Sequence, residues 1–133
     1  KGQVLETILQ DVLDTPVSPE LLPQEDDKIV QKTEDIVGPY ELHDFFIYHM
    51  VRFGDEPRKL YKKTKLAFKD KYDKDTIKKW LRLFYWRFFS QQFKRSCIPD
   101  GPKVGSVALS PRGDWRMPSD ANVQIWLDEV ERI

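Results

Sequence analysis

Five basic side chains are spread through a stretch between residues 93 and 120, and they are the residues of this chain best suited to binding an anion. The same stretch holds four prolines and three glycines. Glycine lets backbone N–H groups approach a bound anion closely, and proline fixes the course of a loop. The combination favours recognition of phosphate or carboxylate groups by Lys94, Arg95, Lys103, Arg112 and Arg116.

A purely structural role remains open for part of this set. Lys94 and Arg95 fall at the end of a predicted helix, where cations also stabilise the negative end of the helix dipole. That role would account for one of the two. It does not account for Lys103, Arg112 and Arg116, which lie farther along the chain among the glycines and prolines.

The other reactive residue types form no recognisable catalytic group. His43 and His49 are six residues apart, on different faces of a helix, without cysteines or carboxylates at metal-ligand spacing. Cys97 has no evident histidine base, so we interpret it as a semi-buried thiol rather than a nucleophile. We therefore predict no catalytic residue and no metal ligand in this chain.

Composition argues against nucleic acid and membrane as partners. The 133 residues include 22 basic and 22 acidic side chains, so no net charge attracts the chain to a polyanion. No apolar run approaches the roughly 20 residues that span a bilayer. The single cysteine excludes an internal disulfide framework and favours a cytoplasmic setting. The first residue is Lys1 rather than methionine, which suggests an excerpt from a longer protein.

Two further segments have alternative interpretations. Residues 58–79 are lysine-rich with interleaved aromatics, typical of a nucleic-acid surface, but the helical spacing and three aspartates favour a solvated helix face. The aromatics of residues 80–89 are expected in the core, with part of them on a partner-facing surface. A helical protein–protein interaction module is therefore the alternative function, and a homo-oligomer is expected.

The elements that must position these residues are all helical. Hydrophobic periodicity predicts an irregular all-α fold of about four to five helices with two long loops, and no strand-like alternation occurs. Asp73 or Asp75 is the predicted cap of the third long helix, and Ser119 that of the last one. Leu66 and Ile125 are assigned to apolar faces. The expected helices are residues 4–13, 39–53, 56–70, 74–96 and 119–132.

The middle of the helix at 74–96, WLRLFYWRFF, is apolar on nearly all sides. Such a helix needs burial on several sides, which the other predicted helices would not fully provide. The segment from residue 15 to 38 has three prolines and no sustained period. Loops longer than about 15 residues are uncommon in compact domains and often functional.

Two segments resemble the NAD synthetase family. A Ser-x-Glu-Leu element leads through a loop to Thr-Glu-Asp, a glycine and a Tyr-x-x-x-Asp helix, here Ser18, Glu20, Leu21, Thr33, Glu34, Asp35, Gly38, Tyr40 and Asp44. Residues 87–120, from RFFSQQFKRSC to SPRGDWRMPSD, are similar to the C-terminal end of the glutamine-dependent bacterial members. The resemblance covers roughly residues 15–121, and its second segment is the more specific.

The resemblance implies an ATP-dependent amidation. The family adenylates nicotinic acid adenine dinucleotide with ATP and Mg²⁺, and ammonia from a separate glutaminase domain then displaces AMP to give NAD. This chain lacks the family's SGGxDS phosphate loop and the glutaminase's Glu-Lys-Cys group. The resemblance thus implies an inactive C-terminal piece that packs on an α/β core and the glutaminase domain, neither of which it contains, and holds no cofactor by itself.

The resemblance also assigns nucleotide-binding roles. Lys94 and Arg95 match the basic pair that reaches toward the nucleotide phosphates, and Thr33 and Glu34 match the acidic end of a closing loop. Ser18 stands where that loop begins, and Lys103 is added from the basic stretch. The expected organisation is a single fragment with a lid at 18–38, a helical core at 39–97 and a basic loop at 98–118.

Overall fold

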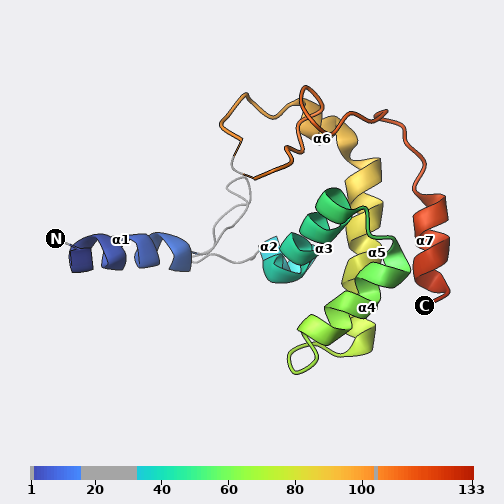
Figure 1. Ribbon diagram of the computed structural model, residues 1–133, viewed down its shortest axis with the longest axis horizontal. Coiled ribbons are helices and arrows are strands. Elements are labelled where there is room, and N and C mark those ends of the chain that lie inside the picture. Colours follow the sequence, from blue (N-terminus) through green and yellow to red (C-terminus); the bar gives the residue numbers. More distant parts are fainter. Residues whose placement is uncertain (1, 16–32, 104) are drawn as a thin grey trace, which may run out of the picture. The chain divides into compact units, whose positions relative to one another are not determined.

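The computed structural model describes residues 2–15, 33–103 and 105–133 (Figure 1), and every regular element within them is helical. This confirms the all-α prediction. The described residues contain seven helices rather than four to five, because two are short helices of five residues each. Contacts divide the chain into two compact units, described separately: the N-terminal unit, Lys1–Pro39, and the helical unit, Tyr40–Ile133.

In the N-terminal unit, α1 (Gly2–Asp14) matches the helix predicted at 4–13. After its last turn, the Thr15 hydroxyl donates to the Asp11 carbonyl at 2.9 Å. Its apolar side chains recur at helical spacing, yet each is more than half exposed: Val4, Leu5, Ile8, Leu9, Val12 and Leu13. The stripe thus gains little cover from the described residues.

The short helix α2 (Thr33–Val37) lies within the predicted lid at 18–38. Glu34 and Asp35 occupy its first turn, where carboxylates complement the positive end of the helix dipole. Gly38 follows with φ of 93°, a left-handed conformation suited to glycine, and its N–H donates to the Glu34 carbonyl at 2.8 Å. Residues 18–32 of the predicted lid lie outside the described residues.

The helical unit begins with α3 (Tyr40–Phe53), which starts one residue later than the predicted 39–53 and ends at the predicted residue. Gly54 has φ of 65°, and its N–H donates to the Met50 carbonyl at 2.9 Å. Next comes α4 (Pro57–Ala67), with proline at its first position, where no N–H is needed. It ends earlier than residue 70, and placing Leu66 on its buried face was wrong because Leu66 is 78% exposed.

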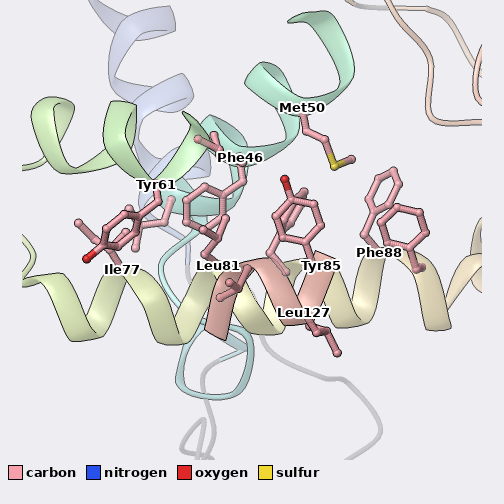
Figure 2. Close-up of a cluster of buried hydrophobic side chains, with 13 residues drawn as sticks. Phe46, Met50, Tyr61, Ile77, Leu81, Tyr85, Phe88 and Leu127 are labelled. Atoms are coloured by element: carbon pink, nitrogen blue, oxygen red, sulfur yellow. The ribbon is translucent and has the colours of Figure 1, made fainter. Parts of the chain in front are cut away.

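The long helix α5 (Lys74–Ser90) lies at the centre and contacts α3, α4 and α7 (Figure 1). Asp73 is its cap, accepting a hydrogen bond from the Thr76 N–H at 2.7 Å. Figure 2 shows core side chains gathered along this helix, with Tyr85 and Phe88 on α5 beside Met50 of α3. Its buried face consists of Ile77, Leu81, Phe84, Tyr85, Phe88 and Phe89. The chain therefore covers most of this apolar helix itself, whereas Trp86 stays 42% exposed.

The prediction of one helix from 74 to 96 was wrong at its end. Gln91, with φ of −110° and ψ of 25°, interrupts it, and α6 (Gln92–Ser96) continues as a separate short helix. The Gln91 N–H still contacts the Arg87 and Phe89 carbonyls. Gln92 is only 1% exposed, so the break places a polar side chain in the interior.

The last helix, α7 (Gln124–Glu131), is shorter than the predicted 119–132, and Ser119 is not its cap. Instead, the Asn122 side chain accepts from the Gln124 N–H at 2.7 Å. Leu127 and Val130 are buried, whereas Ile125 is 76% exposed, so the assignment of Ile125 to the apolar face was wrong.

The Trp126 ring stacks on Phe89 of α5, with centroids 4.2 Å apart, and so joins α7 to the end of the long helix. No helix formed by the described residues is both long and apolar enough to span a bilayer.

Candidate anion-binding loop

The basic stretch predicted from the sequence is a folded loop that starts at α6 and returns to the helical core before α7. It includes a short segment without regular secondary structure, residues 115–117, whose outer two side chains pack on the core. The indole of Trp115 meets the Phe88 ring edge-on at 5.4 Å between centroids. The indole N–H of Trp115 points to the Met117 sulfur at 3.2 Å. The loop is thereby fixed to the end of α5.

Arg95 is bound to the core rather than extended into solvent. Its guanidinium lies over the Phe88 ring, 4.2 Å from the centroid, and Nη2 donates to the Phe88 carbonyl at 2.6 Å. The same nitrogen lies 3.5 Å from the Met117 sulfur. Burial lowers the pKa of Arg95. Its Nε is buried without a hydrogen-bond partner in the described structure, so this cation is largely but not completely satisfied.

Arg112 holds the beginning of the loop against its end. Nη1 donates to the Ser96 carbonyl at 3.1 Å, Nη2 donates to the Ile98 carbonyl, and Nε pairs with Asp100 at 3.0 Å. Two of these acceptors are carbonyls at and just beyond the end of α6, which have no partner within a helix. The planar guanidinium can satisfy several acceptors at once, which a lysine cannot do.

Lys103 forms an ion pair across the loop. Its Nζ lies 2.6 Å from Asp114 Oδ2, and the same oxygen accepts from the Ala108 N–H at 2.8 Å. The hydrogen bond from Lys103, with that from Ala108, lowers the pKa of Asp114. Both side chains are partly exposed, so this pair contributes order to the loop more than stability to the fold.

The two remaining cations of the stretch, Lys94 and Arg116, are exposed. Among the described residues, neither side chain has a hydrogen bond or ion pair. The surrounding unit is basic: the helical unit has 19 basic and 13 acidic residues, a formal charge of +6, whereas the N-terminal unit has 3 and 9, or −6. The overall neutrality of the chain therefore conceals a basic helical unit.

The predicted nucleotide-binding residues are divided between the two units. Lys94, Arg95 and Lys103 belong to the helical unit, where Arg95 and Lys103 make the contacts described above. Thr33 and Glu34 open α2 in the N-terminal unit. Ser18 lies outside the described residues. Their assignment to nucleotide binding stays a prediction.

A pocket of about 270 Å³ opens beside this loop, between α3 and residues 105–109. Its walls are mainly apolar and include Ile47, Val51 and Val107. Asp44 and Arg52, eight residues apart on α3, also line it. Nothing in the sequence pattern pointed to this pocket, because it depends on where the loop folds back.

The other candidates considered from the sequence are a metal site and the thiol of Cys97. Within the described ranges, no group of three His, Cys, Asp or Glu side chains could hold a metal ion. Cys97 is exposed, so its interpretation as a semi-buried thiol was wrong, and its Sγ lies 3.6 Å from the Phe93 carbonyl.

Sequence reasoning missed a buried charge cluster around Asp55. Its carboxylate is fully buried and pairs with Lys59 at 2.7 Å, with Lys63, and with His49 Nδ1 at 3.2 Å. Burial alone would raise the pKa of Asp55, but hydrogen bonds from Lys59 and Lys63 lower it overall. The pattern Gly-Asp between two helices is a weak signal, since such residues are common in exposed turns.

Comparison with known proteins finds relatives that share one name. No family model matches the chain. A protein from Mycobacterium leprae (strain TN) named "Glutamine-dependent NAD(+) synthetase" is 43% identical over 96% of this chain. Proteins of the same name from Mycobacterium bovis and Mycobacterium tuberculosis are each 40% identical over 98% of it. The chain spans 22% of the length of each of these relatives.

Proposed function

Since this chain is homologous to a segment of the glutamine-dependent NAD(+) synthetases, we propose that it is the C-terminal part of an enzyme that makes NAD by ATP-dependent amidation. The observation that carries the proposal is identity of 40% or more along almost the whole chain. The fold agrees with this role, because the helical unit presents a fixed basic loop rather than a catalytic centre of its own.

The proposed reaction has two steps. The nicotinate carboxylate of nicotinic acid adenine dinucleotide attacks the α-phosphorus of ATP, and pyrophosphate leaves. Ammonia derived from glutamine then attacks the activated carbonyl carbon, AMP leaves, and the amide of NAD is formed. The first step is needed because a carboxylate oxygen is a poor leaving group until it is joined to phosphate.

This chain would contribute cationic side chains to that reaction. Both substrates are polyanions, so preorganised positive charge near their phosphates stabilises the bound state and the transition state. Mg²⁺ is expected to accompany ATP in the whole enzyme. The described residues offer no group of three metal-binding side chains, so no part of the metal's role is assigned to them.

The remaining parts of the reaction are proposed to come from the rest of the enzyme. The sequence contains no SGGxDS phosphate loop and no Glu-Lys-Cys glutaminase group, so residues 1–133 by themselves are expected to be inactive. The proposed cytoplasmic enzyme is a homo-oligomer in which this chain packs on the ATP-binding core and on the glutaminase domain.

The test is to supply the full-length protein with ATP, Mg²⁺, nicotinic acid adenine dinucleotide and glutamine. NAD, AMP and pyrophosphate should appear in equal amounts. The reaction should also proceed when ammonium is supplied instead of glutamine. Purified residues 1–133 serve as the control and should form no NAD. Absence of NAD formation by a folded full-length protein would contradict the proposal.

The alternative function, a helical interaction module, is favoured by one observation. The apolar stripe of α1 is more than half exposed, and Trp86 and Phe93 of the helical unit are 42% and 56% exposed. Replacing Lys94 by alanine in the full-length protein separates the two functions. Loss of NAD formation with an unchanged oligomer supports the nucleotide role, and loss of assembly supports the interaction role.

A further inference from the structure

The segment Ser110–Met117 carries one charged residue that the fold of the loop does not explain. Arg112 satisfies carbonyls at the end of α6, and Asp114 pairs with Lys103 and accepts from the Ala108 N–H. Arg116 is the exception: it is exposed and makes no side-chain hydrogen bond or ion pair with the described residues.

The neighbours of Arg116 hold its backbone against the core. Trp115 packs on Phe88, and the Met117 sulfur lies 3.5 Å from Arg95 Nη2. Both neighbours are partly buried against the core, whereas Arg116 between them is exposed. The Arg116 side chain is therefore accessible to solvent on a backbone that its two neighbours anchor.

This arrangement presents a cation on a fixed support. A binding side chain is most effective when packing has already ordered the backbone that carries it, since less freedom is then lost on binding. Here two anchored neighbours hold the backbone of a five-donor cation whose geometry matches phosphate oxygens.

The other cations of the loop are less available. Moving Arg95 would break its contacts with Phe88, and moving Arg112 would expose carbonyls at the end of α6. Lys103 would have to leave Asp114. Lys94 is exposed on α6, but it lacks the planar, forked donors of an arginine.

We propose that Arg116 is a phosphate-binding residue of the enzyme and that it contacts the diphosphate group of a nucleotide substrate. The inference rests on the proposed function. It selects, from the five basic residues of the stretch, one to which the family resemblance assigns no role. The same chemistry occurs in nicotinic acid adenine dinucleotide and in ATP, and the experiment separates these two sources.

The experiment compares Arg116→Ala and Arg116→Lys with the parent full-length enzyme. Calorimetry measures binding of nicotinic acid adenine dinucleotide and, separately, of ATP, and steady-state kinetics give KM for each. A hydrogen bond to a charged group contributes about 1.5–3 kcal/mol, so Arg116→Ala should weaken binding of one substrate by about 10-fold to 150-fold. Arg116→Lys should recover part of the loss.

Salt dependence and a second arginine provide the controls. Because the interaction is between charges, the parent's affinity for the affected substrate should fall with ionic strength more steeply than that of Arg116→Ala. Arg132→Ala removes an exposed arginine from the end of α7 and should change neither affinity nor melting temperature.

If the parent is active and Arg116→Ala has the parent's affinity and KM for each of the two substrates, the inference is overturned and the proposed function is left intact. Loss of affinity together with a lowered melting temperature in Arg116→Ala, without recovery in Arg116→Lys, would assign Arg116 a structural role and also overturn it. An inactive parent would instead contradict the proposed function.

Discussion

The Glu129 carboxylate accepts a hydrogen bond at 3.0 Å from the backbone N–H of Arg58, a residue 71 positions earlier in the chain. Arg58 lies in the first turn of α4, where N–H groups have no partner within the helix. Glu56, in the cap position, makes no side-chain hydrogen bond to this turn. The last helix of the chain therefore caps the second helix of the helical unit.

Replacing Glu129 by alanine should lower the free energy of unfolding by about 1 kcal/mol, the usual cost of losing a helix cap. Glu129→Gln keeps an acceptor oxygen and should lose less. Urea unfolding monitored by circular dichroism measures both. Asp120→Ala, a change outside any helix, is the control and should have no effect beyond a few tenths of a kcal/mol. A Glu129→Ala protein as stable as the parent would show that the contact is dispensable.

The buried Asp55 carboxylate should make the stability of the protein depend on pH. Its pKa in the folded state lies below its value in the unfolded chain, so its contribution is fully present above the unfolded pKa of about 3.9. The contribution is lost as pH falls through the lower, folded pKa. The free energy of unfolding, measured from pH 7 to pH 2, should decrease as the pH falls. The decrease should be smaller in Asp55→Asn than in the parent.

At neutral pH, Asp55→Asn should also destabilise the protein by roughly 2 kcal/mol. This is less than the loss for a fully buried pair, because Lys59 and Lys63 remain 64% and 35% exposed and can be hydrated. The matched control is Asp70→Asn, whose carboxylate is 88% exposed next to Lys69. Identical acid profiles for the parent and Asp55→Asn would contradict the assignment.

Removing Arg112 should loosen the basic loop without unfolding the helical core. Its contacts are confined to the segment from Ser96 to Ser110, whereas the core lies along α5. In Arg112→Ala, amide hydrogen exchange should accelerate at Ala108 and Gly113, while the exchange of the Leu81 amide stays unchanged. Arg112→Lys should not restore protection, because one ammonium cannot replace three guanidinium contacts. Accelerated exchange throughout α5 would mean that Arg112 stabilises the whole unit.

Alanine variants of two helical leucines separate the contribution of helix propensity from that of burial. Leu81 is fully buried on α5, and Leu81→Ala should cost about 2–5 kcal/mol through lost burial and the cavity left behind. Leu66 on α4 is 78% exposed, so Leu66→Ala should change stability by less than about 0.5 kcal/mol. Thermal and urea unfolding of the two variants provide the comparison. Similar losses in both would show that the exposed face of α4 is covered in solution.

Much of the helical unit was predictable because local signals and burial agreed. The bounds of α3 agree with the expected 39–53 to within one residue, Asp73 caps α5 as predicted, and most aromatics of residues 80–89 lie in the core as expected. Where an apolar residue stood outside the packed face, periodicity alone was misleading. Leu66 and Ile125 continue an apolar pattern, yet no neighbouring helix covers either of them completely.

The break at Gln91 and the start of α7 had no sufficient local signal. Neither proline nor glycine marks the break, and Ser119 is as good a cap by residue type as Asn122. Between these two boundaries in the sequence, Trp115 and Met117 pack on the end of α5. Such contacts join residues far apart in sequence, so a short window of residues contains no information about them.

By itself, the sequence determined the all-helical class, the approximate places of the main helices, the basic character of the loop and the likeness to NAD synthetases. Only the tertiary structure decided which cations are available to an anion. Arg95, Lys103 and Arg112 are equivalent in the sequence to Lys94 and Arg116, since all five are basic residues in one polar stretch. They differ because folding brings carbonyls, an aromatic ring and a carboxylate to the first three, and no comparable partner among the described residues to the last two.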